Sequence, residues 1–217
     1  MKIPSIFKSD NHIIYISLAI SIITNILFIQ KIYFPNVLEY VREKIEKPPT
    51  ITQSDHLIGN RKSGVIVIAY MDYQCPYCGI LYPILRKISE KGSILFVYRH
   101  FPLKSHPFAL KSSEAAECAG QQGKFWEYSD RLYSKNGNLS NETFKDISMQ
   151  LHLDNQLFNS CLHKHSYFKY IYSQQNEGIE RRINATPTFF INGNRFNGLI
   201  PKDKTIEIIK EQSVSVH

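Results

Sequence analysis

Apolar positions in this chain follow two patterns, one typical of buried strands and one typical of helices. Runs that are apolar almost throughout occur at three places: residues 64–71, 93–101 and 188–191. Apolar residues at helical spacing occur in several longer stretches: residues 75–91, 109–121, 125–133, 142–151 and 155 onward. A turn at residues 192–194 predicts a hairpin to a strand at 195–197, and a last helix is predicted near 204–212. The predicted order is strand, helix, strand, a group of helices, two strands and a helix.

The N-terminal segment has a different pattern. Residues 11–30 contain no Asp, Glu, Lys or Arg, and residues 13–29 are almost continuously apolar. Such a stretch predicts a transmembrane helix over residues 13–34, preceded by a cytoplasmic N-terminus at 1–12. A cleaved signal peptide is the alternative, because Lys2 and Lys8 precede the apolar stretch. The chain has no alanine between Ala19 and Ala69 to supply a cleavage motif, so we favour an uncleaved anchor.

A spacer is expected between this segment and the folded part. Residues 35–55 contain a charged stretch that predicts a short helix, followed by Pro48-Pro49 and a polar run. The remaining chain, residues 56–217, is long enough for one well-buried domain.

The charge and composition of the chain indicate which classes of partner it is expected to bind. The formal net charge is +7, but the lysines are distributed along the chain instead of forming a basic run. The chain contains no internal repeat and no glycine-rich nucleotide loop. We therefore predict that the protein binds no nucleic acid and needs no cofactor.

The sequence Cys75-Pro76-Tyr77-Cys78 carries the clearest chemistry. Two thiols separated by two residues can close into a disulfide and reopen. The helical pattern starts at Cys75, where unpaired N–H groups and the helix dipole favour the thiolate and lower the thiol pKa. Cys75 is thus predicted to be the nucleophile, and Cys78, one turn later, the more buried resolving thiol.

Metal binding is the alternative use of such a pair. A tetrahedral zinc site would need a second Cys or His pair at matching spacing, and the sequence offers none. The His163 and His165 pair beside Cys161 does not supply it, because helical residues two apart point in different directions. We predict no metal.

A second motif lies far along the chain, at residues 183–193, which read Ile-Asn-Ala-Thr-Pro-Thr-Phe-Phe-Ile-Asn-Gly. Together with Cys75–Cys78 and the Gly-Lys-Phe-Trp-Glu-Tyr run at 123–128, it resembles the DsbA-like branch of the thioredoxin superfamily. The resemblance covers roughly residues 56–212. It implies that Pro187 is cis and that Thr186 and Pro187 face the disulfide and align an incoming substrate strand.

The resemblance also implies a fold and a function. The fold is α/β, a thioredoxin fold with a helical domain inserted at about residues 105–182. The function is thiol:disulfide exchange at Cys75 and Cys78 that introduces disulfide bonds into exported proteins, with Pro76, Tyr77 and Asp72 around the site. A reductase or isomerase, and a non-enzymatic binding domain with a structural disulfide, are the alternatives.

Location and partners follow from this chemistry. A reactive dithiol suits an oxidising compartment, which places the domain in a bacterial periplasm, held at the inner membrane by a single span. A soluble periplasmic protein, after signal cleavage, is the alternative. The expected partners are reduced or unfolded exported proteins and a membrane protein that reoxidises the dithiol.

The two remaining cysteines, Cys118 and Cys161, lie on predicted helices of the insertion. Four cysteines allow three pairings, and some relatives carry a comparable second disulfide in the helical domain. The resemblance therefore implies a Cys118–Cys161 disulfide, and two buried free thiols are the alternative.

Two positions depart from the family pattern. Many relatives carry an acidic residue six positions before the first cysteine, where this chain has Ala69. Asp72, His100 or a water molecule are the candidates to replace it in proton transfer. Strongly oxidising members have histidine before the second cysteine, where this chain has Tyr77, so the sequence leaves the reduction potential open.

Overall fold

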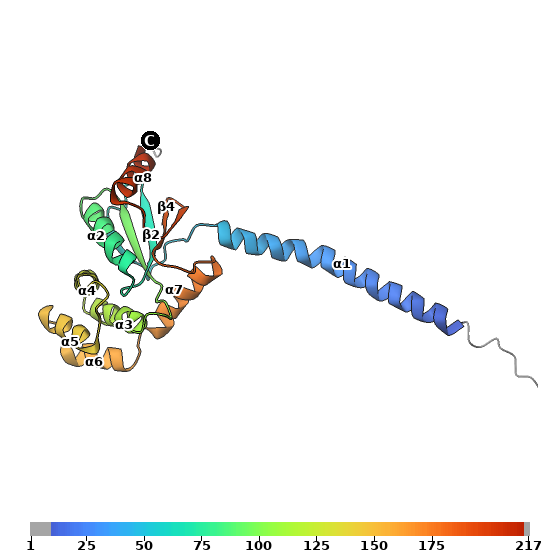
Figure 1. Cartoon of the computed structure of the whole chain (residues 1–217), viewed down its shortest axis with the longest axis horizontal. Coiled ribbons are helices and arrows are strands. Elements are labelled where there is room, and N and C mark those ends of the chain that lie inside the picture. Colours follow the sequence, from blue (N-terminus) through green and yellow to red (C-terminus); the bar gives the residue numbers. More distant parts are fainter. Residues whose placement is uncertain (1–9, 215–217) are drawn as a thin grey trace, which may run out of the picture. The chain divides into compact units, whose positions relative to one another are not determined.

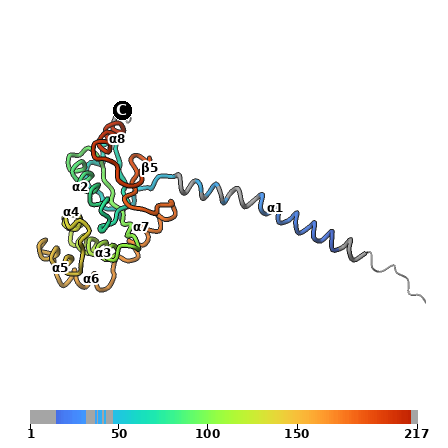
Figure 2. Tube along the Cα trace, in the orientation of Figure 1, coloured from blue at the N-terminus to red at the C-terminus, as the bar shows by residue number. Residues whose placement is uncertain are grey.

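The computed structural model describes residues 10–214; within the first helix it describes the side chains of residues 15–31, 37, 39–40 and 42. The chain divides into two units, residues 1–46 and 47–217. The first contains one helix, α1 (Asp10–Glu46), and the second contains the sheet and all other helices of the described part (Figures 1 and 2). The predicted N-terminus at 1–12 lies largely outside the described residues.

The N-terminal helix bears on the predicted membrane anchor. Residues 13–34 are helical, as expected, and the helix continues through the stretch predicted as a separate short helix. In the described part of the chain, no helix is both long enough and apolar enough to cross a membrane. The membrane-spanning role predicted for residues 13–34 is therefore not confirmed.

The second unit is built on a five-stranded sheet with the order β1-β3-β2-β4-β5. Its strands are β1 (His56–Gly59), β2 (Ile66–Met71), β3 (Leu95–His100), β4 (Thr188–Ile191) and β5 (Asn194–Asn197). The β2 and β3 strands are parallel and are joined by helix α2 (Pro76–Glu90), whereas the other neighbours pair antiparallel. This crossover places the end of β2 and the start of α2 together, as in Figure 1.

Alternate residues of the central strand β2 pack into two different hydrophobic cores. Ala69 and Met71 lie in the larger core with α2, whereas Ile68 and Tyr70 lie in a smaller core on the opposite face. An apolar run in a parallel strand buried on both faces produces this division. Helix α7 (Phe168–Glu180) packs on the smaller core, where a side chain at Gly178 would come within 2.7 Å of the Phe101 ring.

The helical insertion lies between β3 and β4, close to the predicted boundaries. It consists of α3 (Ala109–Gly120), α4 (Phe125–Tyr133), α5 (Asn141–Gln150), α6 (Asn155–His163) and α7 (Phe168–Glu180). Helix α8 (Lys202–Val214) follows the β4–β5 hairpin. Cys118 of α3 and Cys161 of α6 form a disulfide with an S–S distance of 2.00 Å.

Removing this disulfide should lower stability. Because the bond closes a loop of 43 residues, the Cys118→Ala/Cys161→Ala double variant should lose about 3 to 4 kcal/mol of unfolding free energy through the gain in unfolded-state entropy. Urea unfolding of the oxidised wild type and the variant measures the difference. If wild type treated with dithiothreitol, which cleaves this bond, unfolded at the same urea concentration as untreated wild type, the bond would contribute nothing.

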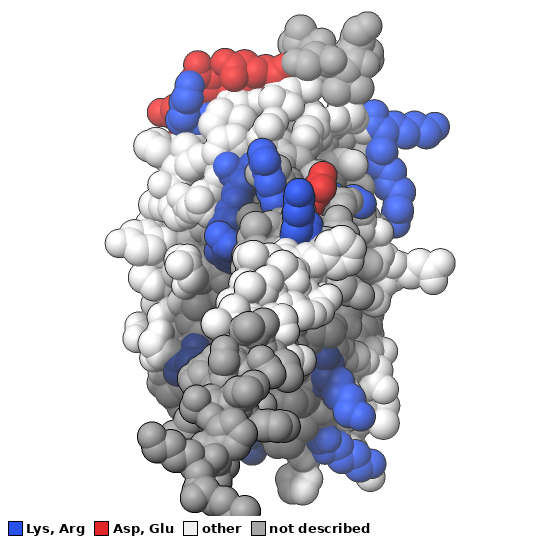
Figure 3. Space-filling view, turned by 90° about the vertical axis from the view of Figure 1, so that its right-hand side faces the viewer, with Lys and Arg blue, Asp and Glu red and all other residues white. Residues whose placement is uncertain are grey.

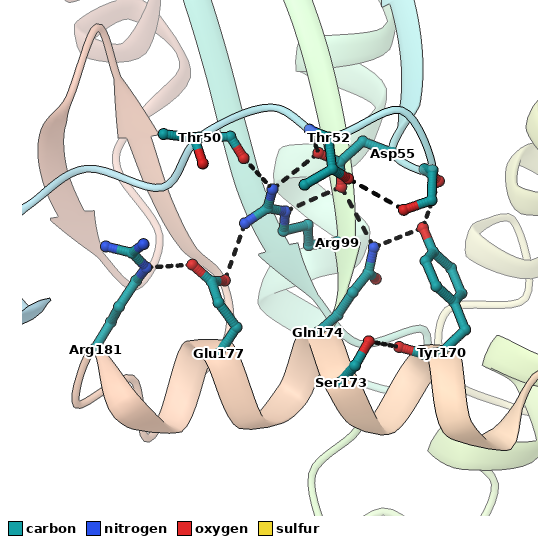
Figure 4. Close-up of a pocket in the computed structure, with 10 residues that line it drawn as sticks. Thr50, Thr52, Asp55, Arg99, Tyr170, Ser173, Gln174, Glu177 and Arg181 are labelled. Atoms are coloured by element: carbon teal, nitrogen blue, oxygen red, sulfur yellow. Dashed lines mark hydrogen bonds and ion pairs between the residues drawn. The ribbon is translucent and has the colours of Figure 1, made fainter.

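The folded unit begins earlier than the sequence indicates. Residues 47–55, predicted as part of a spacer, pack on the sheet and α7 through the buried side chain of Arg99 (Figure 4). Arg99 donates to both carboxylate oxygens of Asp55, at 3.1 and 2.8 Å, and to the carbonyl oxygen of Thr50 at 2.6 Å. Its remaining nitrogen donates to Glu177 of α7 at 2.9 Å. The segment is therefore fixed to the domain.

The charged surface agrees with the excess of basic residues in the sequence. Basic side chains are visible at several separate places on the face in Figure 3, and acidic ones are fewer. Nothing in the described residues tests nucleic-acid binding, which remains a prediction from the sequence.

Candidate active site

Cys75 lies at the junction between β2 and α2. It is the N-cap residue of α2, with extended backbone angles (φ −72°, ψ 120°), and Pro76 occupies the first turn, where its missing N–H costs nothing. The N–H of Gly79 donates to the Cys75 carbonyl at 3.1 Å. Both thiols are free: Cys75 is 5% exposed and Cys78 is fully buried. The sulfur of Cys75 is thus the one nearer to solvent.

The second sequence motif meets this junction. The Thr186–Pro187 peptide bond is cis, and the Cys75 sulfur lies 3.2 Å from the Thr186 carbonyl oxygen, to which it donates when it is protonated. The two residues are 111 positions apart in the chain. Because β4 starts at Thr188 and pairs with β2, the loop before β4 lies against the loop after β2.

Asp72 fixes the turn that carries Cys75. Its buried carboxylate accepts from the Gln74 N–H, the Leu103 N–H and the His106 ring, each at 2.8 Å. Its carbonyl oxygen accepts the Cys75 N–H at 3.2 Å. Asp72 is therefore a positioning residue whose carboxylate already has three donors.

The electrostatics of the two thiols differ. A hydrogen bond from the Cys78 thiol makes the largest contribution to lowering the pKa of Cys75. Thr186 and the N–H groups of Tyr77 and Cys78 add to this effect, and the pKa is lowered to about 6 although burial opposes it. Burial, followed by the hydrogen bond to Cys75, raises the pKa of Cys78 well above its ordinary value. At neutral pH the site therefore holds a thiolate at Cys75 and a thiol at Cys78.

This asymmetry predicts a pH profile. In the reduced protein, alkylation of Cys75 should rise with pH, with its midpoint at about pH 6, and level off at higher pH, because only the thiolate reacts. In Cys78→Ala the midpoint should move to higher pH, since the largest contribution to the lowered pKa is lost. Iodoacetamide kinetics followed by mass spectrometry measure both midpoints, and identical midpoints would show that Cys78 does not stabilise the thiolate.

The remaining predicted residues surround the site. Pro76 and Tyr77 face solvent, with Tyr77 56% exposed, and His100 is fully buried. The His100 ring bonds Glu117 at 2.7 Å, and Glu117 also bonds His56. These bonds lower the pKa of Glu117 to about 2 despite burial. No metal-ligating group of three or more side chains occurs in the described residues.

Sequence reasoning missed two contacts of the site. The turn after α4 approaches the Gln74 backbone, and Gly137 (φ +82°) permits this because a Cβ there would lie 3.0 Å from the Gln74 carbonyl oxygen. A cluster of buried tyrosines lies beneath Cys78: Tyr73, Tyr82, Tyr98 and Tyr133. The tyrosines are scattered through the sequence, so no local pattern indicates that they meet.

Comparisons with known proteins show which families this chain is similar to. The thioredoxin family model matches residues 51–211. Among curated proteins, the Na(+)/H(+) antiporter NhaA 1 of Salinispora arenicola is 36% identical over 152 residues, which are 69% of this chain and 23% of the antiporter. A similar antiporter from Mycobacterium sp. (strain KMS) is 29% identical over 156 residues, 69% of this chain and 25% of that protein. The chain thus spans about a quarter of the length of these curated relatives.

Solved structures share the fold over most of their length. Alpha-DsbA1 of Wolbachia pipientis has a TM-score of 0.67 at 20% identity, covering 76% of this chain and 94% of that one. The catalytic domain of Proteus mirabilis ScsC has a TM-score of 0.64 at 20% identity, covering 82% and 98%. Oxidised BdbD of Bacillus subtilis has a TM-score of 0.64 at 19% identity, covering 78% and 97%. The family match over residues 51–211 shows that the chain belongs to the thioredoxin family, and its fold is shared with these DsbA, ScsC and BdbD structures.

Proposed function

We propose that this protein introduces disulfide bonds into exported proteins by exchange at Cys75 and Cys78. One observation carries the proposal: the low-pKa thiol of Cys75 lies 3.2 Å from the carbonyl oxygen of Thr186, beside a cis proline. A structural disulfide needs neither a stabilised thiolate nor an adjacent backbone acceptor.

The exchange proceeds in two displacements. In the oxidised protein, a substrate thiolate attacks the Cys75 sulfur, the Cys75–Cys78 bond breaks, and the electron pair moves to the Cys78 sulfur, which takes up a proton. A second substrate thiolate then attacks the substrate sulfur of the mixed disulfide. Cys75 leaves as a thiolate, which its low pKa favours, and the substrate gains a disulfide.

Substrate alignment is assigned to the loop before β4. Thr186 and Pro187 are buried, whereas the preceding Asn184 and Ala185 are exposed. An extended substrate segment can bond to the exposed backbone here, while Pro76 and Tyr77 offer an apolar contact on the other side of Cys75. A main-chain interaction of this kind accepts many sequences, as a general oxidase requires.

The direction of electron flow depends on the reduction potential. A stabilised Cys75 thiolate favours the reduced dithiol and makes the disulfide a better oxidant. A pKa of about 6 lies between that of thioredoxin, about 7, and that of DsbA, about 3.5. We therefore expect a potential between about −270 mV and about −120 mV.

Equilibration of the full chain with glutathione buffers, followed by trapping of free thiols, measures this potential. A value near −270 mV would favour the reductase alternative. A pair that no glutathione ratio reduces would favour a structural disulfide.

The compartment and the partners belong to the same proposal. The Cys118–Cys161 disulfide suits an oxidising compartment, so we place the domain outside the cytoplasm. Reduced exported proteins are the substrates, and a membrane redox protein reoxidises the dithiol. Trapping Cys75 and Cys78 in intact cells tests this, because the pair should be mainly oxidised at steady state.

A further inference from the structure

In each exchange cycle Cys78 gains a proton when the disulfide opens and loses it when the disulfide forms again. Its sulfur is fully buried, and burial raises its pKa, so the thiolate released by attack on Cys75 is costly until it is protonated. A buried group must therefore carry a proton between Cys78 and solvent.

The two polar side chains considered from the sequence already have strong partners of their own. Ala69 is apolar. The carboxylate of Asp72 already accepts from Gln74, Leu103 and His106. The Nε2 atom of His100 is bound to Glu117, and burial lowers the pKa of His100 and keeps it neutral.

A pair of tyrosine hydroxyls lies in the right part of the core. Tyr98 of β3 is the parallel register partner of Ala69, so its side chain lies on the same face of the sheet as Ala69, in the core that contains Cys78. The Tyr98 and Tyr133 hydroxyl oxygens are 3.0 Å apart. One proton is shared between these two oxygens, which leaves the second hydroxyl proton for another acceptor.

Neighbouring rings hold this pair in place. The Tyr73 ring, two residues before Cys75, lies 5.5 Å from the Tyr98 ring and 4.9 Å from the Tyr133 ring, centroid to centroid. The Tyr82 ring, one turn after Cys78 in α2, stacks on Tyr133 at 4.2 Å. Tyr133 is therefore fixed between the turn that carries Cys75 and the helix that carries Cys78.

Tyr133, although only 4% exposed, also borders a pocket. It lines a pocket of about 510 Å³ between α2 and α4, together with Gly79, the residue that follows Cys78. Charged side chains of Arg86 and Asp130 line the same pocket, so it can hold water. Tyr133 thus borders both the core that contains Cys78 and a pocket that can hold water.

We propose that the Tyr133 hydroxyl, oriented by Tyr98, relays a proton between this pocket and the sulfur of Cys78. The inference rests on the proposed exchange function. When the Cys75–Cys78 bond breaks, the Tyr133 proton passes to the Cys78 sulfur as Tyr133 takes a proton from pocket water. Reformation of the disulfide reverses both transfers. A negative charge on Cys78 raises the pKa of Tyr133, so the two groups interact electrostatically.

The test compares matched tyrosine variants in the full oxidised chain, reduced by dithiothreitol across neutral and mildly alkaline pH. Tyr133→Phe should slow reduction about 10- to 100-fold, the range for losing one hydrogen bond to a charged group. Its rate divided by the wild-type rate at the same pH should also fall as pH rises, because protonation of Cys78 then depends on free acid, whereas the thiolate fraction of dithiothreitol is the same in both reactions. The control is Tyr128→Phe, which removes another buried hydroxyl of α4, bonded to the Phe144 carbonyl. It should match wild type.

Two results would overturn the relay: a wild-type rate and pH profile in Tyr133→Phe, or the same slowing in both variants without a change of profile. Tyr98→Phe provides a second test if Tyr133→Phe does not fold. It should show a smaller slowing with the same decline relative to wild type as pH rises, and a constant ratio to wild type would equally overturn the relay. Failure of wild type to exchange with dithiothreitol would instead overturn the proposed function.

Discussion

Cys75→Ala should abolish disulfide transfer to a reduced peptide, and Cys78→Ala should accumulate mixed disulfides. Cys75 is the only thiol of the pair with solvent access and a lowered pKa, so no other atom at the site can accept a substrate thiolate. In Cys78→Ala the Cys75 thiolate still attacks a disulfide-bonded partner, forming a mixed disulfide and releasing one partner thiolate, but no second thiol remains at the site to displace the partner. Fluorescence of a quenched two-cysteine peptide measures transfer, and non-reducing gels detect trapped species.

The matched control for this experiment is the Cys118→Ala/Cys161→Ala variant. It removes two cysteines of the insertion and should retain transfer below its unfolding temperature, because the Cys118–Cys161 disulfide is separate from the exchange pair. Transfer by Cys75→Ala at the wild-type rate would refute the assignment of the nucleophile. Loss of transfer in the control at a temperature where it is folded would show that the two cysteine pairs are coupled.

The sequence predicted those parts of the site that local patterns determine. Cys75 caps α2 because the strand pattern ends and the helical pattern begins there, and α4 has the predicted bounds of 125–133. Thr186 and Pro187 could be placed opposite Cys75 only through the family resemblance. Their contact joins residues 111 positions apart, and no pattern in a single sequence encodes that distance.

The sequence did not predict elements whose stability comes from distant partners. The strand β1 is four residues long and pairs with β3 at the sheet edge, so its own sequence carries too little signal to identify it. Residues 47–55 have the composition of a spacer, yet the domain includes them because Arg99 binds Asp55 and Thr50. For residues 47–55, polar composition indicates a loop and cannot show that a buried arginine lies beneath it.

The Arg99 contacts predict a large loss of stability on substitution. Arg99 is 4% exposed and Asp55 is 8% exposed, and two nitrogens of the Arg99 guanidinium donate to the two carboxylate oxygens of Asp55. Arg99→Met should lower the free energy of unfolding by about 3 to 5 kcal/mol, because it leaves the buried Asp55 carboxylate without a counter-charge. Urea unfolding of the full chain, analysed by linear extrapolation, measures this loss.

A second substitution separates the buried charge from lost packing. If the uncompensated carboxylate causes the loss, Arg99→Met/Asp55→Asn should recover much of it, since the amide is neutral and Glu177, 29% exposed on its side chain, remains hydrated. Lys124→Met, which removes the exposed pair with Glu127, should change stability by less than about 1 kcal/mol. A double variant no more stable than Arg99→Met would instead assign the loss to the arginine's own hydrogen bonds. The segment at 47–55 would then be held mainly by the bond to the Thr50 carbonyl, and the charge on Asp55 would contribute little.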